Sequence, residues 1–132
     1  MKNIKSQAAI EFIILISFML FIILSFFAIT SSKVLEARDQ GNKNLAKGIA
    51  EYAYTEIEAA RTVNDGYTRN FTMPNAVNGQ DYSIGIVDDR ELVVVYLENE
   101  YVKFLPSSVI GNISKGYNIV SKQNGIISVI PS

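Results

Sequence analysis

Cysteine and histidine are both missing from this chain of 132 residues. Their absence excludes disulfides, thiolate nucleophiles, imidazole bases and nearly every kind of zinc or copper site. An excess of one charge is also missing, because 12 Lys and Arg residues face 13 Asp and Glu residues, for a net charge of -1. A basic nucleic-acid-binding surface is therefore not expected. We expect no metal and no cofactor.

Hydrophobic residues are distributed unevenly along the chain. Residues 12–29 read FIILISFMLFIILSFFAI, a run of 18 residues interrupted only by Ser17 and Ser25. As a helix this run would be about 27 Å long, close to the hydrocarbon thickness of a bilayer. A cleaved secretory signal has a shorter apolar stretch. The run therefore predicts a transmembrane helix.

The charges before the run predict its orientation. Lys2 and Lys5 precede it, so the positive-inside rule keeps the amino terminus in the cytoplasm and places everything after Lys33 outside. Two Asn-x-Ser/Thr sequons lie on that outer side, and they make Asn70 and Asn112 candidate N-glycosylation sites.

Glu11 lies between Ile10 and Phe12 at the cytoplasmic edge of the run, where Lys is the usual residue. One interpretation is a carboxylate in the first turn of a helix, favoured by the helix dipole. The other is an ionisable group with a function at the membrane, which requires a partner of opposite charge. The sequence offers no obvious partner within the same chain.

The segment from Lys2 to about Leu35 resembles the class III signal peptide of archaeal type IV pilin-like proteins. In that family a membrane-embedded aspartyl prepilin peptidase removes a short basic leader just before the Gln of a Q-x-S-x-E-F pattern. Residues 7–12 read QAAIEF, which matches the pattern at the Gln, the Glu and the Phe, with Ala9 in place of the Ser. Ser6 stands before the cut, where Gly or Ala is more typical.

The resemblance implies a leader of residues 1–6 and cleavage between Ser6 and Gln7. Cleavage would create an ammonium group at Gln7, four residues before Glu11. The resemblance also implies that Gln7, Glu11 and Phe12 act in filament assembly, with the Glu11 carboxylate meeting the amino terminus of a neighbouring subunit. Opposite charges about 4 Å apart gain about 4 kcal/mol at an effective dielectric constant near 20, which would fix one axial register between helices.

Beyond the apolar run, a helical pattern continues. Leu45, Ile49 and Ile57 recur at helical spacing among charged residues, which predicts one long helix over residues 7–63. Residues 39–42 form its weakest stretch, because Gly is a poor helix former, and a kink or local melting is expected there. The turn residues 64–66 end it.

Residues 64–132 predict a β-rich head. Alternating apolar residues and turn signals indicate four to six short antiparallel strands, one face of which packs on the second half of the helix. The expected strands are residues 67–73, 80–87, 91–98, 101–105, 117–122 and 126–130, with turns at 78–79, 88–90, 99–100 and 123–125. The expected fold class is α+β.

Catalysis is not expected. Asp88, Asp89 and Glu91 cluster at a predicted hairpin turn, where carboxylates are usually solvated, and no phosphate-binding glycine loop is present. The resemblance implies a structural subunit of an archaeal type IV pilus-like surface filament that serves adhesion. Its partners would be sister subunits, the prepilin peptidase, an assembly ATPase with its membrane platform, and the membrane before assembly. Two alternatives are a membrane-anchored binding or stator-like module that does not polymerise, and a minor pilin or tip adhesin.

Overall fold

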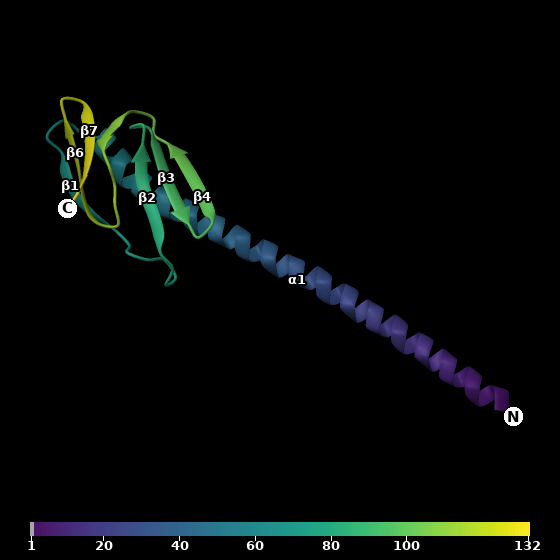
Figure 1. Ribbon diagram of the computed structural model, residues 1–132. Helices are drawn as coiled ribbons and strands as arrows, with labels where there is room; N and C mark the ends of the chain where they lie inside the picture. The colour runs from purple at the N-terminus through teal and green to yellow at the C-terminus, as the bar shows by residue number, and fades with distance from the viewer. Residues whose placement is uncertain (1) are drawn as a thin grey trace. The chain divides into compact units, whose positions relative to one another are not determined.

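The computed structural model describes the backbone of residues 2–132 and the side chains of residues 3–132. Over this range a single helix, α1 (Lys2–Arg61), precedes seven strands (Figure 1). Contacts divide the chain into two compact units, Met1–Asp39 and Gln40–Ser132, and each is described by itself below. The α+β fold class expected from the sequence is confirmed.

The helix assignment is continuous through residues 39–42, so the local melting expected there is absent. The boundary between the two units nevertheless falls at this weak stretch. The helix ends at Arg61, two residues earlier than predicted. Lys122 accounts for this end, because its ammonium group donates to the carbonyl oxygens of Arg61 at 2.9 Å and Val63 at 2.8 Å. A cation at this position also complements the negative end of the helix dipole.

The part of α1 that follows Gln40 has one buried face. Its side chains are small or apolar, and they are Ala46, Ile49, Ala50, Ala53, Ile57 and Ala60. Because alanine adds little bulk, the sheets can approach the helix closely, and α1 shares one hydrophobic core with them. The expected packing of strands on the second half of the helix is confirmed.

The strands form two sheets. The first has the order β1-β6-β7-β5, and the second has the order β2-β3-β4 (Figure 1). All pairs are antiparallel except β5 with β7, which is parallel. The bounds are β1 Thr68–Met73, β2 Tyr82–Val87, β3 Glu91–Tyr96, β4 Asn99–Phe104, β5 Val109–Gly111, β6 Gly116–Gln123 and β7 Ile126–Pro131.

Two predicted hairpins are confirmed. Asn124 and Gly125 join β6 to β7 with positive φ at both residues, as a tight two-residue turn requires. Asp88 and Asp89 also have positive φ and lie in the β2–β3 turn, where both are exposed. Carboxylates on such a turn are solvated, as expected.

Three strand predictions were wrong in detail. The β3–β4 turn is at Leu97 and Glu98, two residues earlier than predicted, with Leu97 at a φ of 54°. The turn expected at Asn78-Gly79 is present but closes only an isolated bridge between Val77 and Gln80. β1 pairs instead with β6, more than forty residues away along the chain. β5 was missed, because three residues carry too little periodicity to be recognised.

Ion pairs tie the second half of α1 to both sheets. Lys103 on β4 lies 2.7 Å from Glu51 and also stacks 4.5 Å above the ring of Tyr54. The hydrogen bond that Lys103 donates to the Glu51 carboxylate raises the pKa of Lys103. Arg69 on β1 lies 3.2 Å from the buried carboxylate of Glu56. Each sheet is therefore anchored to the helix by one charged pair as well as by apolar packing.

The Asn112 side chain adds to the backbone hydrogen bond that joins the two sheets, in which the N–H of Val109 on β5 donates to the carbonyl of Asp89 at 2.8 Å. The Oδ1 atom of Asn112, just after β5, accepts hydrogen bonds from the backbone N–H of Ile86 on β2 at 2.8 Å and of Ile113 at 2.9 Å. Ile113 is only 2% exposed. We call this pair of hydrogen bonds the Asn112 clamp.

Candidate functional site

The most unusual surface of the first unit is its apolar helix. Residues 12–29 are exposed along their whole length, apart from half-buried Ser25. Exposed apolar surface of this extent is rare on soluble proteins and indicates a membrane or protein interface. By length and composition α1 can cross a bilayer.

The hydroxyl groups of this segment, and that of Thr30 directly after it, are bonded to the backbone of the same helix. Each donates to the carbonyl oxygen four residues earlier, at 2.8–2.9 Å, and the pairs are Ser17 with Ile13, Ser25 with Phe21, and Thr30 with Phe26. A polar group without a partner is costly in hydrocarbon. These hydroxyls therefore add little to the cost of burying the helix in lipid.

Glu11 has a partner within the chain after all. The side-chain amide of Gln7 donates to a carboxylate oxygen of Glu11 at 3.3 Å, one helical turn away. Because the amide is neutral, this bond gives Glu11 a hydrogen-bond partner but not the opposite charge that the second sequence interpretation requires. The i,i+4 spacing of Gln and Glu was the signal that could have revealed it.

The other predicted residues of this end lie on the same stretch of helix. Ser6, Gln7 and Phe12 are all exposed, and Phe12 begins the apolar run directly after Glu11. Ser6 and Gln7 lie within the first two turns of α1, where several backbone N–H groups have no partner within the helix and the helix frays most readily. This end combines an accessible Ser6–Gln7 bond with a carboxylate one turn further on.

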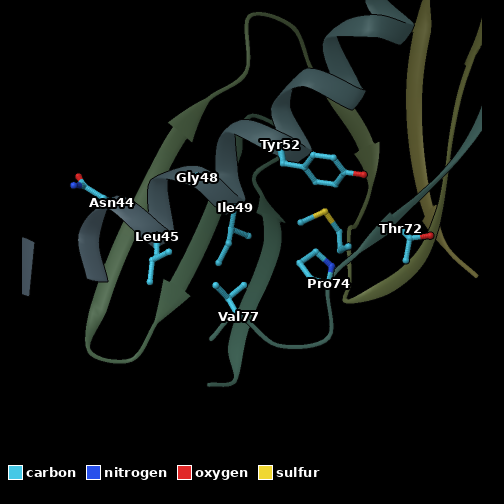
Figure 2. Close-up of a pocket in the computed structure, with 9 residues that line it drawn as sticks. Asn44, Leu45, Gly48, Ile49, Tyr52, Thr72, Pro74 and Val77 are labelled. Carbon is cyan, nitrogen blue, oxygen red and sulfur yellow. The ribbon is translucent and has the colours of Figure 1, made fainter. Parts of the chain in front are cut away.

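The second unit contains an apolar groove with a volume of about 490 Å³. One wall is α1 between Asn44 and Tyr52, and the other is the end of β1 with the segment that follows it (Figure 2). Leu45 and Ile49 extend from the helix toward Val77, whereas Asn44 points away (Figure 2). The lining residues are uncharged, and they are Asn44, Leu45, Gly48, Ile49, Tyr52, Thr72, Met73, Pro74 and Val77. Such a groove can accept apolar side chains.

Two tyrosines hold the outer wall of this groove. The hydroxyl of Tyr82 donates to the carbonyl of Pro74, and the hydroxyl of Tyr96 donates to the carbonyl of Val77 at 3.2 Å. Burial, together with the negative charge of Asp81, raises the pKa of Tyr82 to about 12. Lys115 bonds to Asp81 and lowers the pKa of that carboxyl group.

Sequence reasoning missed the groove, because its walls come from separate segments of the chain. The one signal in the sequence was Gly48 within a helical pattern, which indicated an open surface on the helix.

The two sequons lie near opposite edges of the first sheet. Asn70 is exposed on the edge strand β1, and Asn112 follows the other edge strand, β5. The structure thus leaves the predicted residues in two groups, one at the start of α1 and one on the sheet.

Comparisons with protein-family models, with curated proteins and with solved structures find no match to this chain. In chain order, a long apolar helix precedes a β-sheet head, which is a pilin-like layout.

Proposed function

We propose that this chain is a structural subunit of an archaeal type IV pilus-like surface filament and has no catalytic activity. The observation that carries the proposal is the exposed apolar run 12–29 with the Gln7–Glu11 pair directly before it. In this function the helix of the unassembled subunit spans the membrane, with its amino terminus in the cytoplasm. It then moves from lipid into a bundle of sister helices, and the heads form the outer surface of the filament.

Removal of residues 1–6 by a prepilin peptidase would change the electrostatics at the start of the helix. Gln7 would gain an ammonium group while its side chain keeps Glu11 partnered, as it is in the uncleaved chain. In a bundle the Glu11 carboxylate would then meet the ammonium of a neighbouring subunit. Because helix contacts replace lipid contacts of similar apolarity, packing alone selects a register weakly. The charge pair supplies that selection, and an assembly ATPase on its membrane platform supplies the work.

The test is the substitution Glu11→Ala in the full chain, expressed in its own host. We expect normal membrane insertion, because the apolar run is unchanged, and at least a tenfold loss of sheared filaments. Glu36→Ala is the matched control, since Glu36 is an exposed carboxylate on the same helix that pairs with nearby Lys33 at 3.1 Å. Filament yield should be unchanged in that control. A normal yield from Glu11→Ala would refute the register role.

The amino-terminal residue of the mature protein separates the proposal from a non-polymerising membrane anchor. Mass spectrometry should find Gln7 at the start of the chain. An intact leader on all of the surface material would favour the anchor. A chain that is abundant in sheared filaments is a major subunit, whereas a trace amount would favour a minor pilin or tip adhesin.

A further inference from the structure

We propose that Asn70, and not Asn112, is the residue of this chain that carries an N-linked glycan, and that the glycan covers an apolar patch on the outer face of the β1-β6-β7-β5 sheet. This inference rests on the proposed function, because it requires the head to face outward. It goes further by choosing between the two sequons and by giving the sugar a structural role.

Asn70 and Thr72 present the first sequon openly. Both are exposed, whereas Phe71 between them is 5% exposed, so the Asn and Thr side chains share the outer face of β1. β1 is an edge strand of its sheet, with β6 as its neighbour in the sheet order. A transferase can therefore reach both residues of the sequon from the outside.

The second sequon is tied into the fold. Asn112 is exposed, but its side-chain oxygen is held by the backbone N–H groups of Ile86 and Ile113 in the clamp, and Ile113 between the two sequon residues is 2% exposed. The backbone N–H of Ser114 donates at 3.0 Å to Asn118, a fully buried residue whose amide donates in turn to the carbonyls of Ser114 and Gly116. The folded head therefore holds this sequon fixed from both sides.

The outer face beside Asn70 is apolar. We define the Tyr117 patch as the side chains of Tyr117, Ile119 and Ile130. Tyr117 is 68% exposed and Ile130 is 58% exposed, which is unusual for side chains of this size at the centre of a sheet. Their outward direction follows from the alternation along β6, where Asn118 and Val120 point inward.

The strand register places Asn70 directly against this patch. Asn70 is opposite Ile119, which is in turn opposite Ile130, so the three residues form one row across β1, β6 and β7. Tyr117 is opposite Thr72, diagonally next to Asn70. Directly opposite residues lie about 5 Å apart and diagonal ones about 7–8 Å. Ile130 is two strands away from Asn70, at about 10 Å. The first two or three sugars on Asn70 would therefore reach all three side chains, with the apolar face of a sugar ring against the Tyr117 ring.

The modification is a group transfer onto the Asn70 amide. Its Nδ2 atom bonds to C1 of a sugar that is esterified at that carbon to a polyprenyl phosphate. The C1–O bond breaks, the lipid phosphate leaves with the electron pair, and the amide loses one proton to a base of the transferase. The product keeps the Asn70 carbonyl and carries a bulky, hydrated group at the surface.

The first experiment maps the glycan on the full chain purified from its native host, by mass spectrometry of its glycopeptides. Thr72→Ala should remove the glycan mass completely. Ser114→Ala is the matched control, because it destroys the second sequon but keeps the Asn112 clamp, and it should leave the glycan mass unchanged. A mass lost in Ser114→Ala, or an unmodified Asn70 peptide in the wild-type protein, would overturn the inference.

The same spectra keep this inference separate from the proposed function. A mature chain that begins at Gln7 with an unmodified Asn70 leaves the filament proposal standing and refutes the glycan. A glycosylated Asn70 on a chain that never enters filaments refutes polymerisation and retains the glycan.

The second experiment tests the covering role. Thr72→Ala protein should bind at least twice as much of a fluorescent hydrophobic dye as the wild-type protein, at equal concentration in the same detergent. Adding Ile119→Thr and Ile130→Thr should cancel most of that increase, because only Tyr117 of the patch then remains. Equal dye binding by wild-type and Thr72→Ala proteins would show that the glycan leaves the patch uncovered.

Discussion

Replacing Asn112 by Ala should remove the clamp between the two sheets and lower the stability of the head. Two hydrogen bonds are lost, at 2.8 Å to Ile86 and 2.9 Å to Ile113. Each contributes about 1 kcal/mol net, and a donor left buried without a partner costs about 1–3 kcal/mol. Ile113 is almost fully buried, whereas Ile86 is only half-buried and its N–H can be hydrated. We therefore expect a loss of about 2–3 kcal/mol.

Thermal unfolding of the full chain in detergent micelles measures this loss. The chain has no tryptophan, and all seven tyrosines lie between Gln40 and Ser132, so near-ultraviolet circular dichroism of tyrosine reports on the second unit alone. For a domain of this size, 2–3 kcal/mol corresponds to a decrease in Tm of about 10–20 °C.

Two further variants separate the clamp from other effects of the substitution. Asn112→Asp keeps an oxygen acceptor at the same place, so its stability should stay within about 1 kcal/mol of the wild-type value. Ser114→Ala removes the sequon without touching the clamp and should leave Tm unchanged. The reasoning fails if Asn112→Ala unfolds at the wild-type temperature, or if Asn112→Asp loses as much stability as Asn112→Ala.

Two other predictions follow from the same structure. Gly48 and Gly66 both have open space where a Cβ would be, but Gly48 is helical and Gly66 has a φ of +92°. Gly48→Ala should therefore stabilise the second unit by about 1 kcal/mol and Gly66→Ala should destabilise it by about 1 kcal/mol, in denaturant titrations; effects of the same sign would contradict the backbone argument. Because the pKa of Tyr82 is raised to about 12, above its ordinary value of 10.0, its contribution to stability is complete below pH 10 and is lost as the pH rises toward 12. Between pH 10 and pH 12 the free energy of unfolding of Tyr82→Phe should therefore fall less than that of the wild-type protein. Parallel plots of this free energy against pH for the two proteins would refute the raised pKa of Tyr82.

Local chemistry made the helix and the hairpins predictable. The apolar run specified a helix by composition alone, and Asn124-Gly125 specified a tight turn because both residues tolerate positive φ. The β3–β4 turn was predicted at the wrong residues, because its positive φ falls on Leu97, and leucine rarely adopts a positive φ.

Pairings between distant segments could not be predicted. Periodicity shows which residues share a face of a strand but not which strand lies alongside it. The pairing of β1 with β6 and the division into two sheets could therefore not be predicted. The Asn112 clamp and the groove beside Gly48 also depend on tertiary contacts. The Gln7–Glu11 pair was within reach of sequence reasoning, because both residues lie one turn apart on the same helix.

The self-contained hydrogen bonding of the apolar helix has a consequence for the reverse of assembly. Ser17, Ser25 and Thr30 already have hydrogen-bond partners within the helix, so they need no new polar contact when the helix leaves the bilayer or returns to it. Under the proposed function, the helix of a subunit released from a retracting filament could therefore insert into the bilayer again without refolding. The membrane would then serve as a reservoir from which the same molecules are extended again.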